Sequence, residues 1–316
     1  MTLFFIKGRV ISPYFCTIMN KTLKAHLALL VTTLIFGLHY TIAKSIMPLN
    51  FQPMQLLFLR LLGAVIIFWL FQRLFVPEKV EKKDLLILAL CGILGFALNQ
   101  ALFYEGLNLT TPVDASLIHV MNPVFVLIFA SILIKEKITW MKIAGIVLGA
   151  SGALILILYG RKINMSANSF KGNILVLMNM LFYALYLVMV KPMVAKYHTT
   201  TILKWVSIFG FLFILPFSIK GMLTFQYGAV TLYAWFALAY IIILCTFLAY
   251  LLINYALKVV EASTVSFFTY LQPVIASVTS VSIGGETITL PKVIAAFLIF
   301  SGVYLVNRRD RKLVKW

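Results

Sequence analysis

The sequence predicts an all-α membrane protein with ten transmembrane helices, arranged as two inverted-topology five-helix repeats with both termini cytoplasmic. Three observations lead to this fold class: an apolar composition, a series of long apolar stretches, and a similarity between the two halves of the chain. Of the 316 residues, 62% are hydrophobic and 11% are charged. Soluble domains have roughly 45–50% apolar and about 25% charged residues, so this composition lies outside the soluble class.

Ten apolar stretches are long enough to cross a bilayer, which takes about 20 residues in a helix. They cover residues 26–47, 53–75, 84–104, 112–134, 139–159, 172–190, 200–219, 231–252, 262–283 and 290–307. The connections between them are short and leave no room for a soluble domain. Residues 1–23 form an N-terminal extension. Met19 resembles a natural start, in which case residues 1–18 would come from a translation start assigned too far upstream.

The basic residues predict the orientation of the chain. Cytoplasmic loops of membrane proteins are enriched in Lys and Arg. With the N-terminus inside, twenty of the 27 basic residues lie at the inner face, six lie outside and Arg60 lies within the membrane. Residues 309–316 then form a basic cytoplasmic tail. We therefore attribute the net charge of +18 to orientation in a lipid bilayer and expect no nucleic-acid partner. The expected location is the cell membrane, as a multi-pass protein of a bacterial inner or plasma membrane.

The two halves of the chain are related by an internal repeat. A shift of 150 residues aligns 102–152 with 252–302 without a gap and pairs Pro123 with Pro273 and Glu136 with Glu286. We assign the first repeat to residues 24–160 and the second to residues 171–308. Each repeat holds five spans, an odd number, so the second must enter the membrane in the opposite orientation. Inverted repeats are typical of secondary transporters, with the substrate near the midplane. A duplicated structural protein is the alternative.

Several segments resemble EamA-type members of the drug/metabolite transporter superfamily. They are Ile35-Phe36-Gly37-Leu38-His39-Tyr40 with Lys44, Phe58-Leu59-Arg60, Asn122-Pro123, Glu136-Lys137-Ile138-Thr139, Gln272-Pro273 and Glu286-Thr287-Ile288-Thr289. The resemblance implies a ten-helix carrier with a central cavity, and it favours export of amino acids or related compounds without identifying the cargo. His39-Tyr40 departs from the smaller or neutral residues more familiar in the family, which leaves the local cavity shape open.

Two amides are placed near the bilayer midplane. Asn122 and Gln272 each lie ten residues into their spans, and a helix rises about 1.5 Å per residue. Each precedes a proline, which removes one helix donor and frees a carbonyl one turn earlier. We interpret Asn122 and Gln272 as substrate-binding residues, with Pro123 and Pro273 as structural hinges. An interhelical hydrogen bond beside a packing kink is the alternative.

Arg60 and His119 are the other costly side chains at depth. Arg60 lies seven residues into its span, roughly 10 Å below the outer boundary. A charge there needs a partner or water. One interpretation is binding of an anionic group such as a carboxylate; the other is a structural Arg, which the family favours because an Arg is common there whatever the cargo. His119 shares a helix face with Asn122. A substrate contact, a proton relay and a plain hydrogen bond are all open for it.

Four more side chains complete the predicted binding site: Asn99, Gln100, Tyr183 and Tyr250. Aromatic faces with a few amide and hydroxyl groups suit an amphipathic small molecule. Packing against lipid or neighbouring helices is the alternative for the aromatic residues. Gly145, Gly149 and Gly152 allow close helix approach and could support a homodimer.

Absent motifs narrow the function further. None of the nine acidic residues is predicted at mid-bilayer, which argues against a carboxylate proton relay. The chain lacks a nucleotide-binding glycine loop, a metal-ligand cluster and a hydrolase motif. We therefore predict no enzymatic activity, no catalytic residues, no metal and no cofactor. The predicted function is a secondary transporter that moves small organic metabolites by alternating access to a central midplane cavity. A non-transporting membrane scaffold or receptor, or a channel, is the alternative.

Overall fold

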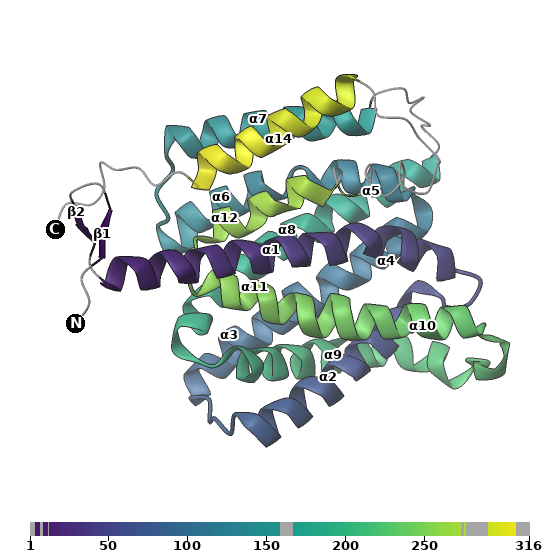
Figure 1. Cartoon of the computed structure of the whole chain (residues 1–316). Coiled ribbons are helices and arrows are strands. Elements are labelled where there is room, and N and C mark those ends of the chain that lie inside the picture. Colours follow the sequence, from purple (N-terminus) through teal and green to yellow (C-terminus); the bar gives the residue numbers. More distant parts are fainter. Residues whose placement is uncertain are drawn as a thin grey trace.

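The computed structural model describes residues 4–6, 9–11, 13–158, 167–272, 275 and 290–307. Apart from loops and one short hairpin, these residues are helical (Figure 1). The first half contains β1 (Phe4–Ile6), β2 (Arg9–Ile11), α1 (Pro13–Ile46), α2 (Pro53–Phe75), α3 (Lys82–Gly92), η1 (Ile93–Leu98), α4 (Asn99–Leu109), α5 (Pro112–His119), α6 (Asn122–Ile134) and α7 (Trp140–Leu158). The second half contains α8 (Ala167–Lys196), α9 (Thr199–Leu223), η2 (Tyr227–Ala229), α10 (Leu232–Tyr240), η3 (Ile241–Leu248), α11 (Ala249–Leu257), α12 (Ala262–Phe267), η4 (Phe268–Leu271) and α14 (Leu290–Asn307).

Six helical segments are long and apolar enough to cross a membrane. They are Lys21–Ile46, Pro53–Phe75, Lys82–Leu109, Phe170–Lys196, Thr199–Leu223 and Leu232–Leu257. Shorter apolar helices cover Asn122–Ile134, Trp140–Ile155 and Val293–Val306. Residues 273–274 and 276–283 of the predicted span 262–283 lie outside the described residues. Within the predicted N-terminal extension, β1 pairs antiparallel with β2 and α1 already begins at Pro13.

The single helix predicted over 112–134 is two helices in the structure. α5 ends at His119 and α6 begins at Asn122. Pro123 has no N–H to donate to the carbonyl of His119, so one α-helical hydrogen bond is missing at this point. The backbone instead tightens, and the Met121 N–H donates to the Ile118 carbonyl at 3.0 Å. In the second half, α12 passes into the 3₁₀ turn η4 just before Gln272, while Pro273 lies outside the described residues.

Corresponding elements of the two halves match closely. The π-helical turns η1 and η3 interrupt equivalent helices, and each packs against a glycine of the other half. A Cβ added to Gly210 on α9 would lie 2.8 Å from the Cβ of Phe96 in η1. Equivalently, a Cβ added to Gly63 on α2 would lie 2.8 Å from Ile242 in η3. Each π turn therefore sits where a small residue on the opposite repeat admits it.

Corresponding helices run antiparallel. Gly145 near the start of α7 faces Gly302 and Val306 near the end of α14, whereas Gly152 faces Ala295. This arrangement is what a pseudo-two-fold relation between the halves requires. The two helices lie side by side at one edge of the molecule (Figure 1). The close approach of α7 to α14 occupies the glycine face that was considered for a homodimer.

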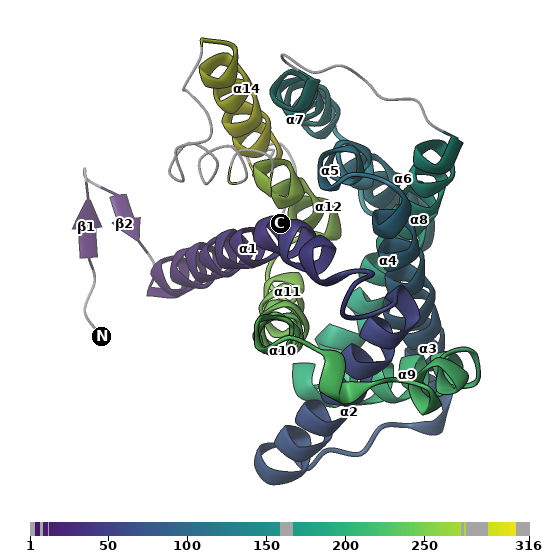
Figure 2. The same ribbon diagram turned by 90° about the vertical axis from the view of Figure 1, so that its right-hand side faces the viewer.

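α2 and α9 are antiparallel as well. Gln55 near the start of α2 donates a hydrogen bond to the carbonyl of Gly221 near the end of α9, at 3.0 Å. At the other end, Lys204 donates to the side-chain oxygen of Gln72 at 3.2 Å. Figure 2 shows this pair on the opposite side of α1 from α7 and α14.

The outer surface is strongly apolar. Phe217 on α9, Phe236 on α10 and Phe297 on α14 are 66%, 68% and 72% exposed. Side chains of this size on so many helices suit contact with the hydrocarbon core of a bilayer. The length of the six apolar segments and this surface describe a multi-pass membrane protein.

Lysines bridge loops at matching positions in the two repeats. Lys44 on α1 donates to the carbonyls of Leu107, Asn108 and Thr110 at 2.7–3.1 Å. Its repeat mate Lys191 on α8 donates to the carbonyl of Val260 at 3.1 Å. Lys44 thereby lies at the C-terminal end of α4, which carries partial negative charge, whereas Lys191 contacts the connection between α11 and α12.

Candidate functional site

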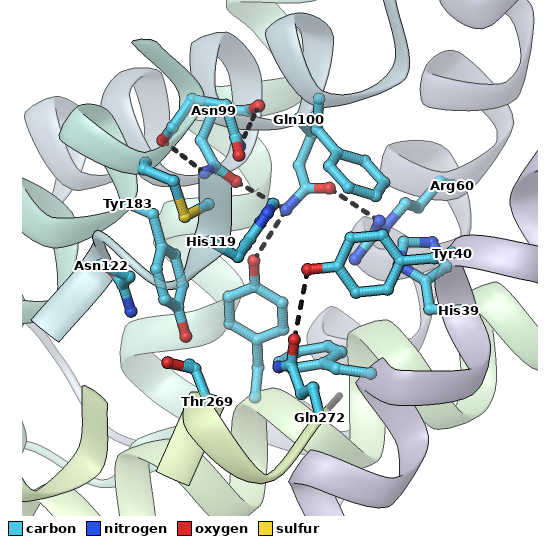
Figure 3. Close-up of a pocket in the computed structure, with 15 residues that line it drawn as sticks. His39, Tyr40, Arg60, Asn99, Gln100, His119, Asn122, Tyr183, Thr269 and Gln272 are labelled. Atoms are coloured by element: carbon cyan, nitrogen blue, oxygen red, sulfur yellow. Dashed lines mark hydrogen bonds between the residues drawn. The ribbon is translucent and has the colours of Figure 1, made fainter. Parts of the chain in front are cut away.

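All eight predicted substrate-binding residues line one cavity between the two repeats (Figure 3). The empty space of the cavity amounts to about 510 Å³ when the open solvent at its mouth is included. The predicted residues lining it are Arg60, Asn99, Gln100, His119, Asn122, Tyr183, Tyr250 and Gln272. The others are Phe36, His39, Tyr40, Phe103, Asn179, Met180 and Thr269.

Arg60 is held on neutral oxygens. Its side chain projects from α2 and the residue is 1% exposed. Nε donates to the Thr246 hydroxyl at 2.8 Å, and Nη1 donates to the Gln100 side-chain oxygen at 2.7 Å and to the Tyr104 hydroxyl at 2.8 Å. Within the described residues, no acidic side chain pairs with Arg60, and the two N–H groups of Nη2 have no hydrogen-bond partner.

The π turn η3 explains how Thr246 meets Arg60. The wider turn shifts the backbone hydrogen bonds, and the Thr246 hydroxyl donates to the carbonyl of Ile241, five residues back, at 2.8 Å. Its proton is thereby committed to the backbone, which leaves the oxygen to accept from the guanidinium. Sequence reasoning missed Thr246, because an apolar stretch carries no visible signal for a π turn.

A chain of amides links Arg60 to α8. Gln100 donates to the Asn99 side-chain oxygen at 2.7 Å and to the Tyr250 hydroxyl at 3.0 Å. Asn99 and Asn179 each donate a side-chain N–H to the other's backbone carbonyl, at 3.1 and 2.7 Å. Asn179 was not predicted, although an Asn four residues before Tyr183 within an apolar span was a usable signal. These bonds hold the polar side of the cavity rigid.

Two histidines of the cavity lining are hydrogen-bonded, and the bond of His119 assigns its tautomer. His119 bonds through Nδ1 to the carbonyl of Ala115 at 2.8 Å, and a carbonyl only accepts, so Nδ1 carries the proton. In the neutral ring Nε2 is then an acceptor. His39 Nε2 lies 3.2 Å from the Tyr104 hydroxyl, which accepts a hydrogen bond from Arg60. In the sequence His39 stands out only as a departure from the family, and its link to Arg60 through Tyr104 was not predicted.

The two midplane amides differ in their partners. Gln272 accepts a hydrogen bond from the Tyr40 hydroxyl across the repeat interface, at 3.2 Å. Asn122 is fully buried, and neither its side-chain oxygen nor its nitrogen has a hydrogen-bond partner within the described part of the chain. Asn179 Oδ1 is likewise without one there. Buried amides are normally satisfied, so a bound ligand or water is the natural partner for Asn122.

The cavity has unlike walls because the repeats diverge at the site. The first repeat contributes Arg60, Asn99 and Gln100, whose repeat mates are Ser207, Ala249 and Tyr250. Ser207 bonds to a carbonyl of its own helix. Tyr183 and Tyr250 form an aromatic side, joined by Phe36 and Phe103 of the first repeat. In the view of Figure 3, Arg60 lies on the right with Tyr40, and Asn122 lies on the left with Tyr183.

Known proteins resemble the chain over most of its length. The model of the EamA-like transporter family matches residues 23–158 and 170–308, once in each half. An uncharacterized transporter of Archaeoglobus fulgidus is 27% identical, covering 92% of this chain and 99% of the relative. A protein of Streptantibioticus cattleyicolor described as a probable terminal-alkyne amino-acid exporter is 25% identical, over 73% of this chain and 76% of the relative.

A crystal structure shares the fold. Its TM-score to this chain is 0.72 at 17% identity, and the match covers 94% of this chain and 98% of the other. Two copies of one family segment, antiparallel corresponding helices and a polar cavity between them agree with the transporter names among the relatives. The chain belongs to the EamA-like transporter family.

Proposed function

We propose that the protein is a secondary transporter that carries small organic metabolites by alternating access to the central cavity. The observation that carries the proposal is a cavity between two antiparallel halves that contains a buried amide, Asn122, with no hydrogen-bond partner among the described residues. Repeats of this kind can tilt against each other around a fixed midplane site. The proposal includes ten spans, both termini cytoplasmic and a bacterial inner or plasma membrane.

The gate at the predicted cytoplasmic end is a set of contacts between repeats. Lys142 on α7 bonds Glu136 at 2.9 Å and Glu261, which precedes α12, at 2.8 Å. Ser263 on α12 donates to Glu136. Opening the cavity to the cytoplasm would separate α12 from the turn between α6 and α7, and these bonds would have to break. The chemistry of transport is then binding and release, without an enzymatic step.

The cargo class rests on a relative and on the lining of the site. The Streptantibioticus cattleyicolor relative is named as an amino-acid exporter, which supports amino acids or related compounds and outward transport. The aromatic and amide lining suits molecules with an apolar body and a few polar groups. We therefore take export of amino acids or related metabolites as the working assignment.

Reconstituted transport tests the function. Metabolites that change between the inside and outside of overexpressing cells are first identified by untargeted comparison. Each is then measured for flux into liposomes containing the purified protein. Saturable flux is expected, and Asn122→Leu and Gln272→Leu should each reduce it at least about tenfold while the amount of folded protein is unchanged.

Gln226→Leu is the matched control, because this amide lies exposed in a loop outside the cavity. Normal flux in both cavity variants would contradict the site assignment. No flux of any identified metabolite would favour the scaffold or receptor, and flux that does not saturate would favour a channel. A homodimer stays a prediction that the oligomeric state in detergent would test.

A further inference from the structure

The cavity carries one uncompensated positive charge. Among its described lining residues, Arg60 is the only permanently charged side chain, and no Asp or Glu belongs to the set. The partners of its Nε and Nη1 are a threonine hydroxyl, an amide oxygen and a tyrosine hydroxyl, all neutral. A buried charge in a membrane protein ordinarily has a counter-charge or water beside it.

The guanidinium is fixed in place but not saturated. Three of its N–H groups hold Arg60 against η3 and α4, which sets the plane of the group. The other two, on Nη2, have no partner within the described residues. These two N–H bonds point away from each other, so a carboxylate oxygen can accept from one of them in a charge-assisted bond, which is stronger than a neutral one.

The rest of the lining limits the number of charges that the cargo can carry. The repeat mate of Arg60 is Ser207, so the second half supplies no second cation at the equivalent position. The opposite side of the cavity in Figure 3 is formed by Asn122 and Tyr183, which are neutral. A dianion would leave one negative charge unpaired, and a cation would be repelled by Arg60.

We propose that the cargo supplies the counter-charge that Arg60 lacks, so that the cavity selects small monocarboxylates. The carboxylate accepts a hydrogen bond from Nη2 of Arg60, and the apolar body of the molecule lies against Phe36, Phe103, Tyr183 and Tyr250. An α-amino acid offers such a carboxylate, but its ammonium group has no acidic partner among the described lining residues. The inference rests on the proposed function and narrows its substrate class. It opposes a purely structural Arg60, which would be indifferent to the charge of the ligand.

Matched ligands test the inference on the wild-type protein. The panel pairs 3-phenylpropanoate, pentanoate and 4-methylpentanoate with the corresponding alcohols and amines, and it adds phenylsuccinate as a dianion. Binding to the purified protein is measured by calorimetry at neutral pH. At least one carboxylate should bind about tenfold or more tightly than its alcohol, a difference of about 1.4 kcal/mol. The amines and the dianion should bind more weakly than the matching monocarboxylate.

Variants then trace the preference to Arg60. Arg60→Met should bring each carboxylate and its alcohol to within about twofold, whereas Arg60→Lys should keep a preference of about threefold or more because the charge is retained. Arg73→Met is the control, since it removes a charge from an exposed position on the same helix. It should leave the preference unchanged.

The inference fails if no carboxylate in the panel binds better than its alcohol, including the case in which none binds. It also fails if Arg60→Met binds cargo but keeps the wild-type preference. The transport function is judged separately, by saturable flux of the metabolites found in cells. Saturable flux of neutral or cationic metabolites would support the transport function but contradict the assignment of monocarboxylates as the substrate class.

Discussion

Replacing Lys142 by methionine should destabilise the protein by about 3–5 kcal/mol, because it leaves Glu136 buried without its cation. The side chains of Lys142 and Glu136 are only 7% and 5% exposed, and Nζ lies 2.9 Å from Oε1. Glu136 keeps the hydrogen bond from Ser263, but a neutral hydroxyl does not replace a positive charge. Its other oxygen has no hydrogen-bond partner among the described residues. Methionine preserves the packing of the lysine stem, so the effect isolates the charge.

Thermal unfolding in detergent measures the loss. For domains of about 150–250 residues, 1 kcal/mol corresponds to roughly 2–4 °C in Tm, so a decrease of about 6 °C or more is expected. Glu261→Gln is the control, because it removes only the ion pair between Lys142 and the exposed side chain of Glu261. The Glu261 side chain is 53% exposed, and an exposed pair contributes about 0.2–1 kcal/mol. Its Tm should therefore fall by no more than about 4 °C.

A double variant distinguishes an unpaired charge from lost packing. Glu136→Gln combined with Lys142→Met replaces the buried pair by neutral side chains, which is often close to neutral in stability. The double variant should therefore recover most of the Tm lost by Lys142→Met alone. The reasoning is refuted if Lys142→Met is no worse than Glu261→Gln, or if the double variant is less stable than the single one.

Two further substitutions probe other parts of the fold. Gly302→Leu should lower Tm and separate α14 from α7, because even a Cβ there would lie 2.7 Å from the Gly145 carbonyl oxygen. Gly228→Ala is the control and should leave Tm unchanged, because a Cβ at Gly228 would have nothing within 4 Å. Equal changes in Tm for the two variants would contradict the packing argument. At the loop before α3, hydrogen bonds from Lys196 and then Lys83 lower the pKa of Glu81. Its stabilising contribution is therefore complete above the ordinary Glu pKa and is lost as pH falls through the lower value of the folded state. Unfolding of Glu81→Gln should differ from wild type at neutral pH and converge with it in acid, and a constant difference would exclude the linkage.

The candidate site was largely predictable from the repeat and from helical rise. Asn122 and Gln272 occupy equivalent depths in their spans, and residues at one depth on helices around one axis converge. Arg60, His119, Tyr183 and the other predicted residues line the same cavity for this reason. Whether they bind the cargo stays a prediction.

Other parts of the site were not predictable. Thr246 meets Arg60 only because η3 widens by one residue per turn, and nothing in an apolar run marks that change. The reciprocal hydrogen bonds of Asn99 and Asn179 depend on the register between α4 and α8. The contact of Tyr40 with Gln272 depends on how α1 lies against the residue that follows η4. A proline signal was present for the break before Asn122, but a kinked helix and two separate helices give the same pattern.

The apolar composition, the depth of each polar residue and the relation of the two halves follow from the sequence by itself. Each depends on the transfer free energy of a single side chain or on the regular rise of a helix, both local properties. Tertiary structure determines which neighbours bond to Arg60, and it leaves the Asn122 amide without a hydrogen-bond partner among the described residues. These contacts join residues far apart in the chain, and angstrom-level packing of helices determines them. The sequence shows that position 60 carries a charge. Only the packed helices show that no acidic side chain lies beside that charge in the described cavity.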